Sequence, residues 1–376
     1  MLILEASRDE LLKPFQTVAG VVEKRSTLPV LSNVLIEGEG GRTTILGTDL
    51  EIQISTDGPQ MPMMSDFRLT VNAKKVHDIL KALPVSAQIA FEYEQNKLTI
   101  KSGKGRYDLQ TLPAEDFPLM SVTDSIVASF HIKQGVLKNL ISQVEYAMAK
   151  QDIRFYLNGL LLQVEGNVLR LVATDGHRLA YTQCEIESNL PACEVILPRK
   201  TIAELEKILT FPEESISVDL FSNQVCFTLR DAVIISKIVE GKFPDYNRVI
   251  PQDNDKIFQL SCKEFLSALE RASIFANEKF HGINLGIHPG QMSIESRSSE
   301  HEQAREILEI AYQGTQLEMG FNVNYLKDVL IALKDTLESV NSNDDVRMAF
   351  GDATKSVLIT IPNNQNFKYI VMPMRI

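Results

Sequence analysis

An aspartate and a histidine lie two positions apart in the segment 173–180, which reads Ala-Thr-Asp-Gly-His-Arg-Leu-Ala. A carboxylate close to an imidazole is a common pair in general acid–base catalysis, so Asp175 and His177 could in principle activate a water molecule for hydrolysis. The Asp-Gly dipeptide also predicts a tight turn between two strands, with Leu179 buried in the second strand. The segment therefore allows three hypotheses: a catalytic pair, a site at which His177 and Arg178 bind a partner, and a structural turn.

Other sequence patterns with catalytic or metal-binding chemistry are missing. The run 103–106, Gly-Lys-Gly-Arg, lacks the glycine spacing and the Ser or Thr of a phosphate-binding loop. The run from His301 to Arg305 has arginine where a zinc-binding helix of the H-E-x-x-H type has its second histidine. No serine has the flanking glycines of a nucleophile elbow, and the six histidines show no metal-ligand spacing. We therefore expect no catalysis, no metal ion and no cofactor.

The Thr-Asp pair of this segment belongs to an internal repeat. Thr48-Asp49 returns as Thr174-Asp175, and Phe117-Pro118 returns as Phe243-Pro244, each 126 positions later. Two apolar stripes recur in nearly the same register: Leu11, Phe15, Val18 and Val22 as Leu137, Ile141, Val144 and Met148; and Val76, Ile79 and Leu83 as Ile202, Leu205 and Leu209, then as Leu326, Val329 and Leu333. Self-similarity at a fixed period indicates repeated structural units. Since copy one has Thr-Asp without His-Arg, we interpret Thr-Asp as a turn of the fold and His-Arg as an addition for binding.

The repeat predicts three domains of one design, 1–125, 126–253 and 254–376. Each copy has two stretches with apolar residues at helical spacing and several stretches that alternate apolar and polar residues, as strands do. The first helices are expected at 9–22, 133–149 and 262–276, and the second helices at 73–83, 199–209 and 325–333. Strands are expected at 50–55, 97–102, 215–220 and 225–230, hairpin turns at 165–167 and 222–223, and linkers near 121–125 and 251–255. The predicted fold class is α+β, with two helices on one face of an antiparallel sheet in each copy.

The chain is acidic, with a formal charge of −11, but its charges are unevenly placed. The six helical regions with their flanking residues, 9–25, 70–83, 131–150, 198–210, 261–279 and 322–338, together carry +4, which leaves −15 for the rest of the chain. A protein of this charge is not expected to coat nucleic acid with its whole surface, although a local basic face is compatible with it. No apolar run approaches the roughly 20 residues of a membrane helix, and the acidic N-terminus does not read as a signal peptide. Four cysteines without C-x-x-C spacing indicate reduced thiols, so we expect a cytoplasmic protein.

Five segments of the chain carry a recognisable pattern: Arg154-Phe-Tyr-Leu-Asn-Gly159, Thr174-Asp-Gly-His-Arg-Leu179, Gly241-Lys-Phe-Pro-Asp-Tyr246, Gly320-Phe-Asn-Val-Asn-Tyr325 and Val371-Met-Pro-Met-Arg-Ile376. Together these segments resemble the bacterial sliding clamps, the beta subunits of DNA polymerase III. The resemblance implies a DNA clamp fold in which a head-to-tail homodimer closes six modules into a ring. Helices then line a hole for duplex DNA, bound without regard to sequence, and the ring tethers the polymerase. The implied partners are the clamp loader, the polymerase catalytic subunit and other proteins that carry short linear motifs.

The resemblance also assigns roles to residues of this chain. The positions that match DNA-contacting residues are Arg25, Lys74, Gln151, Phe155 and Tyr156. The positions that match the partner-peptide pocket are Leu157, Thr174, Gly176, His177, Arg178, Leu179, Pro244, Arg248, Val249, Asn322, Tyr325, Ser356, Met372, Pro373, Met374 and Arg375. The positions that match the dimer seam are Tyr107, Leu109, Ile274 and Phe275, with Lys104 and Arg106 facing Glu300, Glu302 and Glu306. Two positions depart from the family pattern: Phe155 replaces a frequent tyrosine and keeps stacking without the hydroxyl, and Arg305 replaces a frequent acid.

Two other functions remain open from the sequence. A scaffold ring could use the same pocket without DNA in the hole, and a hydrolase could use Asp175 and His177. Retention on circular but not on linear DNA separates a clamp from a scaffold. A turnover that His177→Ala abolishes in the purified protein would be needed to support a hydrolase.

Overall fold

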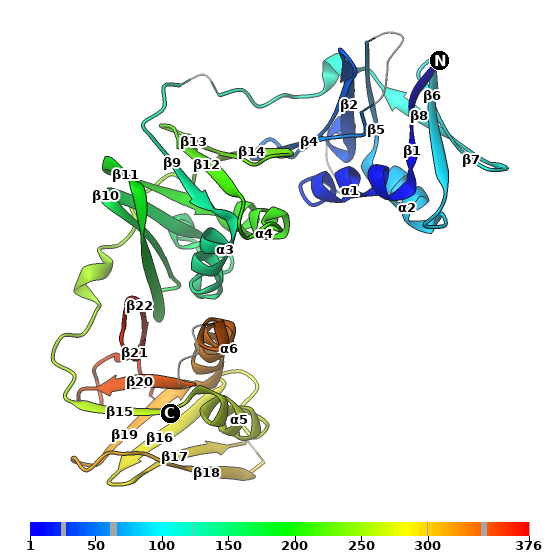
Figure 1. Ribbon diagram of the computed structural model, residues 1–376. Coiled ribbons are helices and arrows are strands. Elements are labelled where there is room, and N and C mark those ends of the chain that lie inside the picture. The colour runs from blue at the N-terminus through cyan, green and yellow to red at the C-terminus, as the bar shows by residue number, and fades with distance from the viewer. Residues whose placement is uncertain (24–27, 61–65, 123, 299, 340–343, 376) are drawn as a thin grey trace. The chain divides into compact units, whose positions relative to one another are not determined.

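The computed structural model describes residues 1–23, 28–60, 66–122, 124–298, 300–339 and 344–375 (Figure 1). The chain forms two compact units, Met1–Gly135 with Ala203–Ile238, and Val136–Ile202 with Val239–Ile376. The helices α3 (Gln134–Ser142) and α4 (Arg199–Ile208) cross the boundary between them. This grouping does not separate the three predicted domains, so their bounds stay a prediction.

The first unit is built on an antiparallel sheet that is twelve strands wide in the described part of the chain. From one edge to the other the strands are β1 (Leu2–Ser7), β6 (Gln88–Glu94), β7 (Lys97–Ser102), β8 (Gly105–Leu112), β5 (Phe67–Asn72), β2 (Asn33–Glu39), β3 (Arg42–Thr48), β4 (Ile52–Asp57), β14 (Ala232–Lys237), β13 (Gln224–Thr228), β12 (Ser215–Leu220) and β9 (Ala128–Lys133). The helices α1 (Arg8–Ala19) and α2 (Ala73–Ala82) contact each other, and short 3-10 turns lie at Pro29–Ser32 and Ala114–Asp116.

The start of α1 shows how the sequence fixes a helix locally. Ser7 is its N-cap and accepts a hydrogen bond from the Glu10 backbone N–H, while the Glu10 carboxylate accepts one from the Ser7 backbone N–H. This reciprocal capping box satisfies two N–H groups that a helix start otherwise leaves free. The stripe residues Leu11, Phe15 and Val18 are buried, as their spacing predicts.

The second unit holds two antiparallel sheets. The larger has the order β10 (Gly159–Thr174), β11 (Arg178–Pro198), β22 (Asn364–Val371), β21 (Val357–Ile361), β20 (Asp345–Phe350) and β15 (Lys256–Ser261). The smaller has the order β18 (Gln303–Glu309), β17 (Gln291–Arg297), β16 (Gly282–His288) and β19 (Leu317–Asn322). Helices α5 (Cys262–Ser273) and α6 (Val323–Ser339) contact each other, and 3-10 turns lie at Glu145–Ala147, Phe155–Leu157 and Tyr246–Arg248. Helices combined with antiparallel sheets confirm the predicted α+β class.

The same kind of strand pairing joins successive copies of the repeat. Strand β4 of copy one pairs antiparallel with β14 of copy two, with Ile54 opposite Ile234. Strand β11 of copy two pairs antiparallel with β22 of copy three, with Ala180 opposite Tyr369. We call each of these pairings a joint.

Two predicted helices have different bounds in the structure, and one predicted hairpin turn is confirmed. The helix expected at 133–149 ends at Ser142, where the side chain of Gln143 turns inward to hydrogen-bond Thr182 and Thr336 and a 3-10 turn follows. The hairpin turn expected at 165–167 is confirmed: Gly166 has φ +62°, and Arg170 hydrogen-bonds the Glu165 carboxylate (2.9 Å), which residues five positions apart cannot do within one extended strand. The second helix of copy three, expected at 325–333, is longer and covers Val323–Ser339.

Candidate functional site

The turn between β10 and β11 is fixed by its own threonine and aspartate. The Asp175 Oδ1 atom accepts hydrogen bonds from the backbone N–H groups of His177 (2.9 Å) and Arg178 (3.1 Å). Thr174 Oγ1 donates to the Arg178 carbonyl (2.6 Å) and accepts from the Gly176 N–H (3.1 Å). Gly176 has φ +90°, which an L side chain rarely adopts.

Copy one makes the same turn 126 positions earlier. Asp49 Oδ1 accepts from the backbone N–H groups of Glu51 (2.9 Å) and Ile52 (2.8 Å), and Thr48 Oγ1 bonds the Ile52 carbonyl (3.0 Å) and the Leu50 N–H (3.1 Å). The interpretation of Thr-Asp as a structural turn is thus confirmed. In copy two the other carboxylate oxygen, Asp175 Oδ2, accepts from Arg178 Nε (3.1 Å), so the carboxylate is occupied by the turn and the guanidinium.

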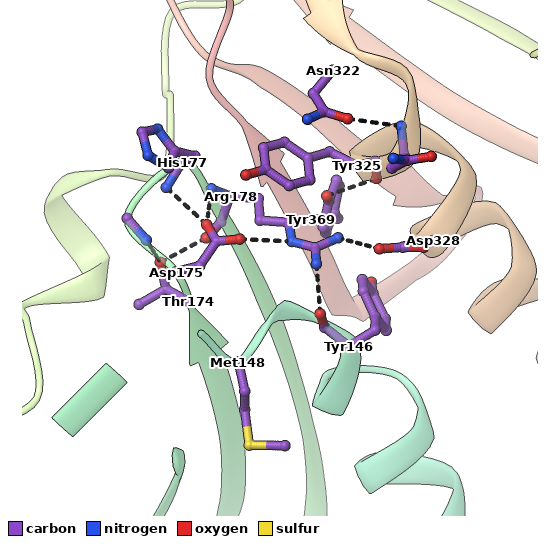
Figure 2. A network of polar contacts seen from close by, with 12 residues as sticks. Tyr146, Met148, Thr174, Asp175, His177, Arg178, Asn322, Tyr325, Asp328 and Tyr369 are labelled. Carbon is purple, nitrogen blue, oxygen red and sulfur yellow. Dashed lines mark hydrogen bonds and ion pairs between the residues drawn. The ribbon is translucent and has the colours of Figure 1, made fainter. Parts of the chain in front are cut away.

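Arg178 extends from this turn into the interior of the second unit (Figure 2). Its guanidinium donates to Asp175 Oδ2, to Asp328 Oδ2 on α6 (2.6 Å) and to the Tyr146 carbonyl (2.6 Å). It also lies over the Tyr325 ring, 4.5 Å from the ring centroid. The side chain of Arg178 is only 8% exposed, so these partners replace the water that a charged group otherwise binds. We call these residues the Arg178 network.

Burial and neighbouring charges shift the ionisation of this network. Burial alone would lower the pKa of Arg178, but Tyr369, the hydrogen bond to Asp328 and the charge of Asp175 raise it above its ordinary value. Burial raises the pKa of Tyr369 and of Tyr146 far above the usual range. Tyr369 donates its hydroxyl to the Tyr325 carbonyl (2.8 Å), whereas the buried Tyr146 hydroxyl has no hydrogen-bond partner among the described residues. Arg178 is therefore charged, and Tyr146 and Tyr369 are neutral, at neutral pH.

A pocket of about 190 Å³ lies beside this turn. It is lined by Arg154, Tyr156, Leu157, Thr174, Gly176, His177, Arg178, Leu179, Pro244, Asp245, Tyr246, Val249, Ile370 and Met372. Several of these side chains belong to a buried apolar cluster that also includes Leu161 and Val172. A mainly apolar cleft with a few polar groups at its rim is typical of a binding site for a small ligand or a short peptide.

The structure brings together nine of the residues predicted for the pocket. These are Leu157, Thr174, Gly176, His177, Arg178, Leu179, Pro244, Val249 and Met372. Tyr325 lies under the Arg178 guanidinium, Asn322 accepts the Asn324 N–H at the start of α6, and the Ser356 carbonyl accepts from Asn254. Arg248 is exposed and pairs with Asp245 (2.9 Å). The role of each of these residues in binding stays a prediction.

The C-terminal tail runs from this pocket to a second hollow. The Met372 N–H donates to the His177 carbonyl (2.9 Å), and the Met374 N–H donates to the Gly320 carbonyl of β19 (2.8 Å). Met374 and Arg375 line a hollow of about 720 Å³ over the smaller sheet. Pro373 connects Met374 to Met372, which lines the pocket. The tail thus connects the larger sheet to the smaller one.

Three of the residues predicted to contact DNA, Lys74, Gln151 and Phe155, are exposed, and Arg25 falls outside the described residues. Lys74 is exposed in the first turn of α2. Gln151 is exposed with φ +57°, and the Phe155 side chain is 73% exposed. Tyr156 is half-buried and lines the pocket, so its position fits peptide binding as well as DNA binding.

The loop that holds Gln151 and Phe155 is organised by Asp152. Its carboxylate accepts from the Arg154 backbone N–H (2.8 Å) and pairs with the Arg154 guanidinium (2.9 Å). These hydrogen bonds lower the pKa of Asp152 to about 2.

The residues predicted for the dimer seam lie at two places. Tyr107 and Leu109 are on β8, whose segment 105–110 pairs with β7 on one side only, since β5 pairs with β8 only at Leu112 and Thr111. Ile274, with a side chain 75% exposed, and Phe275 follow the end of α5. Strand β18, which contacts α5, is an edge strand of the smaller sheet in the described part of the chain.

Two of the charged residues predicted for the seam, Glu306 and Arg106, have partners within the chain, as does Arg305. The Glu306 carboxylate accepts from Arg271 (2.6 Å), and Arg305 pairs with Glu295 (3.3 Å). Arg106 pairs with Asp108 (3.2 Å). The electrostatic part of the seam stays a prediction.

The sequence analysis missed several residues of the site. Arg154, Asp245, Tyr246 and Ile370 line the pocket, and Asp328 and Tyr146 hold Arg178. Arg154 and Tyr246 lie in segments that carried the resemblance, so proximity along the chain could have indicated them. Asp328 is 150 positions from Arg178 and has no local signal.

The described residues contain no cluster of His, Cys, Asp or Glu suited to a metal ion. Within the same described ranges, no helix is both long and apolar enough to cross a membrane.

Comparison with protein families gives three consecutive matches. The family models for the N-terminal, central and C-terminal domains of the DNA polymerase III beta subunit match residues 2–121, 131–245 and 247–375. The beta sliding clamps of Salmonella typhimurium and Escherichia coli K12 are 41% identical over 373 residues and 40% identical over 369 residues, each covering 98% of both chains. A solved structure of the Pseudomonas aeruginosa DNA polymerase III subunit beta aligns over 100% of both chains with a TM-score of 0.93 and 40% identity. A Caulobacter crescentus beta sliding clamp aligns equally completely, with a TM-score of 0.91 and 34% identity.

The repeated helix-and-sheet module, with its strand-to-strand joints, defines the class of DNA clamps. The chain belongs to the DNA polymerase III beta subunit family, the bacterial sliding clamps, and is a processivity factor of DNA replication.

Proposed function

We propose that two copies of this chain associate head to tail in a ring around duplex DNA, and that the pocket beside Leu179 binds short linear motifs of partner proteins. The partners are the polymerase catalytic subunit, the clamp loader and other DNA-processing proteins. The ring catalyses no reaction itself and acts in the cytoplasm, an environment in which its four free cysteines remain reduced.

Ring closure is supported by the repeated joint. The chain forms this strand pairing twice, and the two strands that would form a third pairing have no such partner among the described residues. The first strands of the joints begin at Ile52 and Arg178, and the matching strand of copy three, β18, begins at Gln303. The second strand of the first joint, β14, has its copy-one counterpart in β8, since Ala232 lies 126 positions after Arg106. Both β18 and the segment 105–110 of β8 have a free edge in the described chain. Pairing β18 of one chain with β8 of another repeats the joint and closes two chains symmetrically.

Binding of DNA in such a ring depends on topology and needs only weak contacts. Lysine and arginine attract phosphates without regard to sequence, and this attraction weakens as salt is added. Lys74, Gln151 and Phe155 are exposed and can reach a backbone, while the surplus of acidic residues elsewhere discourages binding to other surfaces. Few contacts also keep friction low while the ring slides.

Binding of partner motifs is supported by the composition of the pocket. Leu179, Pro244, Val249 and Met372 provide an apolar lining, and methionine adapts its shape to different side chains. The side chains of Val249 and Met372 are 38% and 42% exposed, so they are accessible to a ligand. A pocket of about 190 Å³ suits one or two apolar side chains of an extended peptide.

The central test is retention on DNA. Wild-type protein is loaded onto nicked circular DNA by its clamp loader, and half of the sample is then linearised. We expect the protein to stay on the circle and to leave the linear molecule through its ends. Equal loss from both forms would rule out encirclement and favour the scaffold alternative.

A second test separates the pocket from the seam. Deletion of Met372–Ile376 removes one wall of the pocket and leaves β8 and β18 unchanged. We expect binding of the polymerase catalytic subunit to be lost while the solution mass stays near twice 42.2 kDa. A dissociated dimer, or retained polymerase binding, would contradict this division of roles.

A further inference from the structure

We infer that Asp328 of α6, which does not line the pocket, is a positioning residue that sets the affinity of the pocket by keeping the Arg178 side chain out of it. The inference rests on the proposed binding of partner motifs at this pocket.

Arg178 lies between the pocket and the interior. Its neighbours His177 and Leu179 line the pocket, as does part of Arg178 itself. Its guanidinium points the other way, toward Asp328, Tyr146 and the face of Tyr325 (Figure 2). The direction of this side chain therefore decides whether the pocket is open.

Asp328 is the partner that can hold the guanidinium in this direction. The other carboxylate, Asp175, belongs to the same turn as Arg178 and can follow it, whereas Asp328 is anchored on a separate helix. Oδ2 of Asp328 is 2.6 Å from Nη1 of Arg178, and the Asp328 side chain is 37% exposed against 8% for Arg178. Asp328 thus neutralises a buried charge at little desolvation cost to itself.

Removal of the Asp328 charge leaves the buried guanidinium with Asp175, on its own turn, as its one remaining carboxylate partner among the described residues. A buried charge that loses a partner favours any conformation that restores contact with water. The pocket is open space that Arg178 already borders, so its side chain can rotate into it. A peptide then binds only the fraction of molecules in which Arg178 is withdrawn, and the apparent affinity falls by that fraction.

This mechanism predicts a kinetic signature for Asp328→Asn in the full-length dimer. Binding to the immobilised DNA polymerase III catalytic subunit of the source organism is measured by surface plasmon resonance. We expect the association rate constant to fall on the order of tenfold and the dissociation rate constant to stay within about twofold of wild type, since the bound complex is unchanged. A loss of direct ligand contacts would instead raise the dissociation rate constant.

Three variants make the test decisive. Glu165→Gln removes the carboxylate that pairs with Arg170 (2.9 Å) in the same sheet, and we expect wild-type rates from it. Asp328→Glu keeps the charge, so the inference requires an association rate close to wild type, and a rate as slow as that of Asp328→Asn would overturn it. Val249→Asp places a charge in the accessible part of the pocket and reports whether the pocket binds the polymerase at all.

The outcomes of the inference and of the proposed function are distinguishable. If Val249→Asp binds like wild type, the proposed use of the pocket fails. If Val249→Asp abolishes binding and Asp328→Asn binds with wild-type rates, the pocket is confirmed and the role of Asp328 is refuted. A lower melting temperature of Asp328→Asn with unchanged association would likewise assign Asp328 a purely structural role. If Asp328→Asn does not fold, the rate measured with Asp328→Glu decides.

Discussion

At the scale of single residues, both oxygens of the Asp175 carboxylate have hydrogen-bond partners within the chain. One of its oxygens accepts two backbone N–H groups and the other accepts the Arg178 guanidinium. The equivalent Asp49 makes the same two backbone contacts in a turn that has no histidine. The hydrogen bonds of Asp175 therefore explain its place in the sequence as a turn residue, and His177 remains available to a ligand at the rim of the pocket.

Asp152 should show an acid-shifted titration. Hydrogen bonds from Arg154 lower its pKa from 3.8 to about 2 in the folded protein. Because the folded value lies below the unfolded one, the contact stabilises the fold above pH 3.8 and loses that contribution as the pH falls through about 2. NMR titration of the Asp152 carboxyl carbon should give a midpoint near 2, rising toward 3.8 in Arg154→Met. An unchanged midpoint in that variant would show that Arg154 is not the cause.

Cys262 should be the least reactive of the four cysteines. Burial, together with the nearby Asp344, raises the pKa of its thiol to about 12, and its side chain is 1% exposed. Since the thiolate is the reactive form, Cys262 should resist alkylation by iodoacetamide at pH 8 in the native protein. Peptide mass mapping should show labelling at the half-buried Cys193 first, and all four sites should react in guanidinium chloride. Native labelling of Cys262 at the rate of Cys193 would contradict its burial.

At the scale of elements, the two Thr-Asp turns use one hydrogen-bond pattern with different residues at its strained position. Leu50 has φ +76° where copy two has Gly176 with φ +90°. A non-glycine residue in this region costs about 1–2 kcal/mol, while glycine loses more conformational entropy on folding. The repeat thus provides two matched sites at which opposite substitutions test the same strain.

Leu50→Gly should raise the free energy of unfolding by about 0.5–1 kcal/mol, and Gly176→Ala should lower it by about 1–2 kcal/mol. The added methyl group at position 176 would also lie 3.1 Å from the Arg154 guanidinium. Urea denaturation with unchanged m-values checks both changes. The same sign for both substitutions would show that backbone strain does not determine the stability of these turns.

At the scale of the whole molecule, the repeated joint favours one arrangement of two chains. The seam that we propose brings the exposed Ile274 of one chain toward β8 of the other. An aspartate at this position would be buried without a partner in the dimer but solvated in the free chain. Ile274→Asp should therefore shift the solution mass from about twice 42.2 kDa to 42.2 kDa without changing the melting of the monomer. Ile331→Asp, at an exposed isoleucine of α6, serves as the control and should remain dimeric.

The sequence by itself determined what depends on local periodicity. The apolar stripe of α1 and the capping residues Ser7 and Glu10 act within a few positions, so they define a helix before any tertiary contact forms. The Thr-Asp turns and the 126-residue spacing could likewise be predicted, because both are patterns in the order of the residues. The spacing alone indicated repeated modules. The end of α3 at Ser142 could not be predicted, because the Gln143 side chain hydrogen-bonds Thr336, which is 193 positions away in the sequence.

Only the tertiary structure decided how the site is assembled. Arg178 was predicted as a pocket residue that binds a partner, but its guanidinium is buried against Asp328 and over Tyr325, about 150 positions away. A buried charge needs partners, and these can come from any part of the chain that the fold brings close. A local sequence pattern does not show which residues they are. For the same reason the pocket combines Leu179, Pro244 and Met372 from three separate stretches of the chain. The family resemblance and the Thr-Asp turn were predicted from the sequence. The packing of β11, β22 and α6 determined the direction in which the Arg178 guanidinium points.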